Sequence, residues 1–286
     1  MTGDPDIHVI EAIGRCRIVV RDGVVLEVGP PIIRECPLAR RFARPVHPIT
    51  PEAVKENIEH RIRSFGMCSA ERQVLSSGEY VGFGASELIS YGLSSHRFDA
   101  AVIACEGAGT VIASTPELVQ GIGGRMSGLV RTSPIPGVIA SIELNGGIIP
   151  FRDTAALDQP GGVRVACASG YEKIAVTVVL PSDAREVRDI CPNAFIIAVH
   201  TTGISTEDAA SYAGTCDIVT ACASRAVREV AGPRALIQAG SSIPVFAMTP
   251  EAKRLILEKV GEAGGQFLVT GARLPFTGDT LPGPLV

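Results

Sequence analysis

The clearest apolar run in this chain of 286 residues is Ile174-Ala175-Val176-Thr177-Val178-Val179. A strand that is apolar on both faces is buried on both sides, which is typical of a parallel sheet covered by helices. Similar runs occupy residues 100–104, 195–199, 218–221 and 243–247, and a weaker one occupies 147–150. The sequence therefore predicts an α/β fold whose mostly parallel sheet carries helices on both faces.

Helix starts lie between these runs, and residues that cap helices mark them. Ser205 is followed three residues later by Asp208, Ser224 follows the run at 218–221, and Thr249 directly precedes Pro250. Ser and Thr are favoured N-caps, and proline is favoured at the first helical position. From residue 173 to 263 the strand–helix unit recurs every roughly 22 residues, which fits successive β-α-β units.

The N-terminal part has a different pattern. Asp22-Gly23 lies between two apolar β-type segments and predicts a tight hairpin turn. Thr50 as N-cap and Pro51 at the first position predict a helix that ends at Gly66. The expected organisation is an N-terminal hairpin, Pro-rich loop and helix over residues 1–80, an α/β domain over 81–270, and a Pro/Gly-rich tail over 271–286.

Composition excludes several classes of protein. Hydrophobic residues make up 46% of the chain and charged residues 20%, whereas disordered chains combine low hydrophobicity with high charge. The formal net charge of −4 argues against a protein that binds nucleic acid by neutralising its phosphates. No apolar run approaches the roughly 18 residues of a membrane span, and the acidic, polar start does not resemble a signal peptide. We therefore expect a cytoplasmic protein without nucleic-acid or membrane partners.

The eight cysteines are the unusual feature of the composition. None forms a C-x-x-C pair, which argues against a zinc ribbon or a thioredoxin-type pair, and disulfides are rare in a reducing cytosol. Free cysteine is often a small buried apolar residue, and we assign Cys167, Cys191 and Cys216 to packing. The alternative for the other cysteines is that some converge on a metal ion or iron–sulfur cluster, or that one is a nucleophile.

One edge of the predicted sheet collects residues that can do chemistry. Ligands of open parallel sheets bind beyond the carboxyl ends of the strands. The runs that end there lead into Cys105 and Glu106, into His200, Thr201 and Thr202, and into Cys222 and Ser224. Cys222 also precedes a predicted helix N-terminus, where the helix dipole favours a thiolate. We expect a functional site at this edge, although small polar residues also end strands for structural reasons.

A glycine-rich segment at residues 120–128 is a second candidate. Backbone N–H groups and a guanidinium in such a segment can hold a phosphate or carboxylate. The candidate ligand or cofactor residues are Gly121, Gly123, Gly124, Arg125 and Ser127, together with Thr201 and Thr202. The segment lacks the G-K-[ST] ending of a P-loop and the third glycine of a dinucleotide fingerprint, so no nucleotide is indicated. Alternatively, the glycines serve tight turns that need positive φ.

Five strings of the sequence are long enough to compare with known families. They are Phe65-Gly66-Met67-Cys68, GAGTVI at 107–112, PELVQGIGGR at 116–125, AVHTTG at 198–203 and DIVTACAS at 217–224. Together they resemble methanogenesis marker protein 8, a family of methane-producing archaea. The resemblance implies a cytoplasmic protein of an anaerobe that serves methyl-coenzyme M reductase, its maturation factors or the making of its cofactors. It implies no catalytic residues, so the site residues rest on the sequence pattern.

Three hypotheses follow. The first is a cysteine-using maturation or cofactor-assembly factor, in which Cys36, Cys68, Cys105 and Cys222 bind an iron–sulfur cluster or another thiolate-bound metal. The second is a metal-free small-molecule enzyme or sensor that binds an anionic ligand at the glycine-rich segment, with Cys222 and His200 as nucleophile and base. The third is a non-catalytic assembly protein, acting as a homo-oligomer or with a partner.

Overall fold

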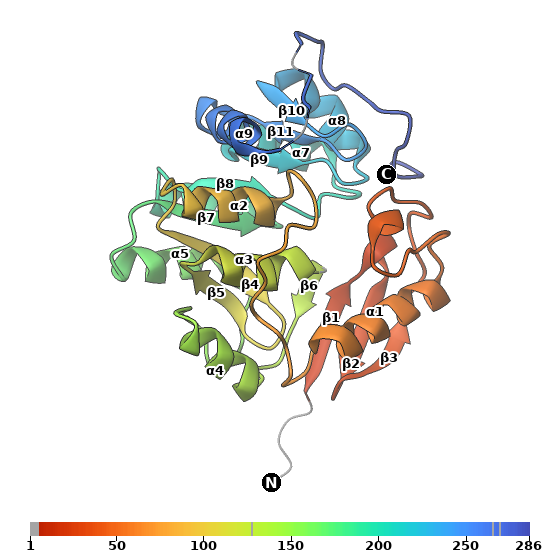
Figure 1. Ribbon diagram of the computed structural model, residues 1–286, viewed down its shortest axis with the longest axis vertical. Coiled ribbons are helices and arrows are strands. Elements are labelled where there is room, and N and C mark those ends of the chain that lie inside the picture. The colour runs from red at the N-terminus through yellow and green to blue at the C-terminus, as the bar shows by residue number, and fades with distance from the viewer. Residues whose placement is uncertain (1–5, 127, 265, 269) are drawn as a thin grey trace.

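The computed structural model describes residues 6–126, 128–264, 266–268 and 270–286, and Figure 1 shows two β-sheets lying side by side. The smaller sheet is antiparallel, in the order β3-β2-β1-β6. Its strands are β1 (Ile7–Glu11), β2 (Arg17–Arg21), β3 (Val24–Val28) and β6 (Gly128–Arg131). The predicted N-terminal hairpin is confirmed as β2 and β3, joined at Asp22-Gly23.

The larger sheet has the order β10-β11-β9-β8-β7-β4-β5. Its strands are β4 (Ala100–Cys105), β5 (Gly109–Ala113), β7 (Ile174–Val178), β8 (Phe195–Ala198), β9 (Ile218–Thr220), β10 (Ile237–Ala239) and β11 (Val245–Ala247). The centre, β4-β7-β8-β9, is parallel as predicted.

Both edges of the larger sheet are antiparallel, so the description as mostly parallel holds only for the centre. Parallel neighbours need a crossover of a dozen or more residues, whereas β4 turns directly into β5 through residues 106–108. Gly107 and Gly109 have positive φ in this turn. At the other edge β10 and β11 form a hairpin, and β11 pairs antiparallel with β9. The weak run at 147–150 makes a single bridge, between Ile112 and Ile148.

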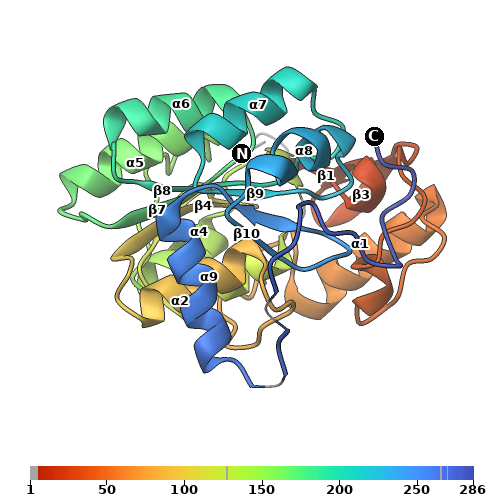
Figure 2. The ribbon, with the colours of Figure 1, turned by 90° about the horizontal axis from the view of Figure 1, so that it is seen from above.

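Helices cover both faces of the larger sheet (Figure 2). One face carries α5 (Gln159–Ala168), α6 (Pro181–Ile190), α7 (Thr206–Thr215) and α8 (Arg225–Val230), and the other carries α2 (Ala85–Ser94), α3 (Pro116–Ile122), α4 (Pro136–Leu144) and α9 (Pro250–Glu262). The predicted caps are confirmed at Ser205, Ser224 and Thr249, whose side chains accept backbone hydrogen bonds. None of the helices in the described ranges combines the length and the apolar character that a membrane span requires.

The smaller sheet packs against α1 (Pro51–Phe65) around its own apolar core. Thr50 caps this helix and Gly66 ends it in the left-handed conformation, as the sequence predicts. Short 3-10 turns complete the fold: η1 (Ile13–Arg15), η2 (Ala39–Arg41), η3 (Gly123–Arg125) and η4 (Gly232–Arg234). The smaller sheet also contains β6, which comes from residues 128–131. The predicted boundary at residue 80 therefore does not separate the residues of the two sheets.

The smaller sheet lies at the carboxyl end of β8. Arg15 Nη1 donates to the carbonyl oxygen of Thr202 at 2.9 Å, and Gly128 of β6 pairs with Glu11 of β1 close to His200. The sheet edge at which parallel sheets usually bind ligands is therefore covered by another part of the same chain.

The end of the tail also docks on this chain, and Figure 1 shows it beside the N-terminal part. Gly283 exchanges backbone hydrogen bonds with Glu35, at 2.9 and 3.0 Å. Val286 N donates to the carbonyl of Ala223 at 3.0 Å, and Arg225 N donates to Val286 O at 2.9 Å. The tail thus straps the smaller sheet to the start of α8.

We expect removal of residues 283–286 to destabilise the whole chain. It deletes these four backbone hydrogen bonds, each worth about 0.5–1.5 kcal/mol, so the free energy of unfolding should fall by about 2–6 kcal/mol. Urea unfolding measures this change. Leu268→Ser, at a position between α9 and the tail that is 90% exposed, is the control and should change stability little. A truncated chain as stable as the control would contradict the strap.

Candidate functional site

Hydroxyl groups at the covered edge are engaged with the backbone. Thr201 Oγ1 donates to the carbonyl of Thr220 at 2.5 Å, and Thr202 Oγ1 accepts from Ala223 N–H at 3.1 Å. Ser224 caps α8. These side chains join the loops after β8 and β9, so their role in the structure is to hold the edge together.

His200 lies at the junction of the two sheets. It follows β8 with φ of 56°, and a Cβ placed on Gly128 would lie 3.5 Å from its Nδ1. Burial lowers the pKa of His200, while Glu11 raises it by less. His200 is therefore neutral at pH 7, and within the described residues no hydrogen bond joins it to Cys222.

Cys222 has no base beside its thiol in the described part of the chain. Its φ is 43°, and its Sγ lies 3.8 Å from Thr220 Oγ1. Burial raises the pKa of Cys36, and a charge on Cys222 raises that pKa further. Cys36 therefore lies near Cys222. The predicted pair of Cys222 and His200 is thus not assembled as nucleophile and base, because the His200 ring is turned toward β6.

Cys68 and Cys105 lie elsewhere, beside a buried ion pair. Arg72 Nε donates to Glu106 Oε1 at 2.6 Å, and these side chains are 0% and 1% exposed. Cys105 Sγ lies 4.0 Å from Glu106 Oε2. Burial raises the pKa of Cys68 and Cys105 strongly, the charge on Glu106 adds to this, and Arg72 opposes it. Both sulfurs are therefore protonated thiols at neutral pH and poor nucleophiles.

The four proposed ligand cysteines divide between two places. Cys36 lies near Cys222, whereas Cys68 and Cys105 lie beside Glu106. Within the residues that the structure describes, no three His, Cys, Asp or Glu side chains are grouped so that they could hold a metal ion. An iron–sulfur cluster needs three or four thiolates in one place, so this arrangement does not fit that group.

The glycine-rich segment is helical rather than an open loop. It forms the end of α3 and the turn η3, and its glycines allow close packing. A Cβ on Gly121 would lie 2.0 Å from the carbonyl oxygen of Val74, and one on Gly124 would lie 2.7 Å from the Tyr80 ring. Gly123 likewise faces a side chain of α2. Ser127 lies outside the described residues.

Three guanidinium groups surround one aromatic ring beside this segment. Arg61, Arg72 and Arg125, here named the arginine cluster, have their Cζ atoms 5.6, 5.1 and 5.2 Å from the centroid of Phe65. Arginine over an aromatic face is stabilised by the negative face of the ring. Phe65 and Gly66, the last residue and the C-cap of α1, therefore fix the place where the three cations meet.

The three arginines differ in how far their donors are engaged. Arg72 is the most engaged of the three, because its Nη1 and Nη2 also donate to the carbonyls of Gln73, Gly121 and Ile122. Arg61 donates to the backbone carbonyl of Arg125. Arg125 Nε donates to the Tyr80 hydroxyl at 2.6 Å, but its Nη1 is buried and has no hydrogen-bond partner among the described residues.

The arginine cluster remains strongly positive. Burial lowers the pKa of Arg61 to about 10, with Glu106 opposing and Arg72 acting in the same direction, so Arg61 stays charged at pH 7. Glu106 neutralises one of the three cations through Arg72. A buried N–H group without a partner costs free energy, and an anion at this place would supply both the acceptor and the charge.

Sequence reasoning identified Arg125 but missed its neighbours. Arg61 and Phe65 are four residues apart on one helix, a spacing that brings side chains together and that the sequence displays. Arg72 and Glu106 meet only through tertiary packing, and no local pattern marks that pair.

We expect Glu106→Gln to be strongly destabilising. It keeps the shape of the side chain but leaves Arg72 buried without its counter-ion, which costs about 3–5 kcal/mol. Glu186→Gln is the matched control, because Glu186 pairs with Arg164 at 2.8 Å on the surface and such pairs are worth under about 1 kcal/mol. If urea unfolding showed equal losses of unfolding free energy in Glu106→Gln and Glu186→Gln, the prediction for the buried pair would be contradicted.

Stability should fall in alkaline solution because of the buried thiols. Burial raises the pKa of Cys16 to about 11 and raises that of Cys105 further, against about 8.5 in an unfolded chain. The folded state then holds protons that the unfolded state releases, so this stability is complete below about pH 8.5 and is lost as the pH rises through the folded pKa.

Cys105→Ala should therefore lose less stability between pH 8 and pH 10.5 than the unsubstituted protein, as measured by urea unfolding. Val111→Ala, a buried position in the same apolar cluster, is the control and should lower stability without changing its pH dependence. An unchanged slope in Cys105→Ala would contradict the assignment to this thiol.

Comparison with known proteins shows similarity to archaeal proteins. Residues 8–261 match the model of a family described as uncharacterized proteins conserved in archaea, DUF2099. An uncharacterized protein of Methanocaldococcus jannaschii is 41% identical over 285 residues, covering 98% of this chain and 100% of that protein. The chain belongs to the DUF2099 family of archaeal proteins.

Proposed function

We propose that this protein binds a small anionic molecule at the arginine cluster and acts as a small-molecule enzyme or sensor. The observation that carries the proposal is Arg125 Nη1, a buried guanidinium nitrogen that lies beside two further cations and has no hydrogen-bond partner within the part of the chain that the structure describes. Guanidinium groups hold carboxylates and phosphates through paired, charge-assisted hydrogen bonds.

The three arginines have different roles in the proposed site. Arg72 is held by Glu106 and three carbonyls, so it supplies a fixed positive field. Arg61 and Arg125 are half-buried, and Nη1 of Arg125, which meets no acceptor in the described ranges, can donate to the ligand. Tyr80, which is 42% exposed and accepts from Arg125, stands at the outer side of the cluster. The ligand would enter from that side.

The neighbouring thiols favour recognition over thiol chemistry at this place. The pKa of Cys68 and the pKa of Cys105 are raised by burial, so no thiolate stands ready to attack the ligand. A protonated sulfur beside the ion pair adds packing without competing for the cations.

The resemblance to methanogenesis marker protein 8 supports a setting for this proposal. The ligand would then be an anionic small molecule of a methane-producing archaeon, and the protein would serve methyl-coenzyme M reductase or its cofactors by binding that molecule.

Titration calorimetry with inorganic phosphate and pyrophosphate tests the site. Loss of one charge-assisted hydrogen bond costs about 1.5–3 kcal/mol, so Arg125→Gln should weaken binding at least about tenfold. Arg63→Gln removes the same charge from an exposed position on α1 and is the matched control. The proposal is wrong if the unsubstituted protein binds neither anion, or if both variants weaken binding equally.

A further inference from the structure

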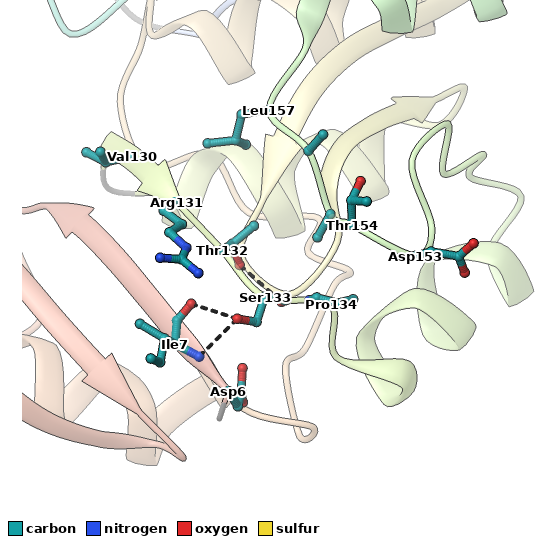
Figure 3. Close-up of a pocket in the computed structure, with 12 residues that line it drawn as sticks. Asp6, Ile7, Val130, Arg131, Thr132, Ser133, Pro134, Asp153, Thr154 and Leu157 are labelled. Atoms are coloured by element: carbon teal, nitrogen blue, oxygen red, sulfur yellow. Dashed lines mark hydrogen bonds between the residues drawn. The ribbon is translucent and has the colours of Figure 1, made fainter. Parts of the chain in front are cut away.

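A groove of about 910 Å³ opens between the start of the smaller sheet and the loop before α5. Figure 3 shows Asp6 and Ile7 on one wall, Arg131, Thr132 and Ser133 along the floor, and Asp153 and Thr154 opposite. No sequence pattern marked this place, because its walls come from three distant segments.

Three side chains at this groove form a hydroxyl–imidazole–carboxylate series. Thr132 Oγ1 lies 2.7 Å from His8 Nδ1, and His8 Nε2 lies 2.7 Å from Asp6 Oδ1. His8 is 0% exposed, and Thr132 is 6% exposed where it lines the groove together with Asp6. The hydroxyl and the carboxylate are therefore linked through an imidazole that water does not reach.

The hydrogen-bond partners fix the protons along this series. Gly107 N–H donates to Thr132 Oγ1 at 2.7 Å, so the threonine proton must point elsewhere. Its two possible acceptors are His8 Nδ1 at 2.7 Å and the Ser133 carbonyl at 3.4 Å, and the shorter contact favours the imidazole. His8 then carries its own proton on Nε2, facing Asp6.

Burial supports this protonation state. Desolvation lowers the pKa of His8, and the nearby charges of Asp6 and Glu106 oppose it, so the imidazole is neutral at pH 7 with a free electron pair on Nδ1. The contact between Asp6 Oδ1 and His8 Nε2 is short, yet neither atom meets the other in hydrogen-bond alignment. Bent contacts of this kind are common in catalytic sites without substrate and tighten when substrate binds.

We propose that this groove is a hydrolytic site in which Thr132 is the nucleophile, His8 the general base and Asp6 its orienting carboxylate. This series has the roles of the nucleophile–base–acid triad of hydrolases, on an unrelated fold. The Gly107 N–H group favours negative charge on the attacking oxygen.

The reaction balances with water as the second reactant. Thr132 Oγ1 forms a bond to the carbonyl carbon of an ester or thioester, and its proton passes to His8 Nδ1. The bond from that carbon to the leaving oxygen or sulfur breaks, and the leaving group takes the proton from His8. Water then gives a proton to His8, adds to the acyl carbon and releases the acid, and the proton returns to Thr132.

The groove also indicates the substrate class. Arg131 projects into it beside Thr132 and, among the described residues, makes no ion pair (Figure 3). A free guanidinium there fits an acyl or leaving group that carries a carboxylate or phosphate. Ala155, which also lines the groove, has φ of 48°, a strained conformation for a residue with a side chain, and such strain clusters at functional sites.

The alternative is that His8 and Thr132 only tie β1 to the strand end after β6 and to the β4–β5 turn. A structural tie needs the hydrogen bonds but no reactive oxygen. Covalent labelling of the oxygen therefore separates the two roles.

A fluorophosphonate probe with mass mapping of the labelled peptide tests the proposal. The attacking oxygen displaces fluoride from phosphorus, and the base takes the proton. We expect one label per chain at Thr132, equal or faster labelling of Thr132→Ser, and none in Thr132→Ala. His8→Gln should label at least about 100-fold more slowly, since a general base contributes about 10²–10⁴ in rate.

Thr154→Val is the control, because it removes an exposed hydroxyl from the same groove and should label normally. Circular dichroism of each variant separates misfolding from lost reactivity, and Thr132→Ser keeps both hydrogen bonds. Folded protein that takes no label in either the unsubstituted or the Thr132→Ser form overturns the proposal, as does equal labelling of Thr132→Ala.

Discussion

The buried ion pair of Arg72 and Glu106 connects most of the elements that matter in this structure. Glu106 begins the turn from β4 to β5, and Arg72 also binds the last carbonyls of α3. Arg72 further touches the Phe65 ring at the end of α1. Two charges without water attract strongly only if their remaining donors and acceptors are satisfied, and here the carbonyls do that. The pair thus fixes how the smaller sheet and α1 sit against the larger sheet.

Polar side chains gather on both sides of this pair because it makes the seam between the sheets polar. Toward α1 lie Arg61 and Arg125, and toward β1 lies His8, whose pKa responds to the charge on Glu106. An apolar seam would pack as firmly but would hold neither a cation cluster nor a buried imidazole. The two candidate sites therefore both adjoin the pair of Arg72 and Glu106.

Local pattern predicts the elements of this fold but not its sites. Strands and caps depend on neighbouring residues, so the hairpin at Asp22-Gly23 and the cap at Ser205 could be read from the sequence. His8 and Thr132 are 124 residues apart, and the pair of Arg72 and Glu106 spans 34. Their meeting depends on how β6 leaves the larger domain to join the smaller sheet, which no periodicity encodes.

The usual ligand edge of a parallel sheet is closed here, and this explains where the candidate sites lie. Thr201 and Thr202 bind the backbone of that edge, Arg15 reaches across from the smaller sheet, and the tail ending at Val286 seals the start of α8. The polar residues at these strand ends, which the sequence suggests as functional residues, therefore serve to hold the edge of the sheet together. With that edge occupied, the groove at Thr132 and the cation cluster around Phe65 both lie where the second sheet meets the first, and ligand chemistry has to be sought along that seam.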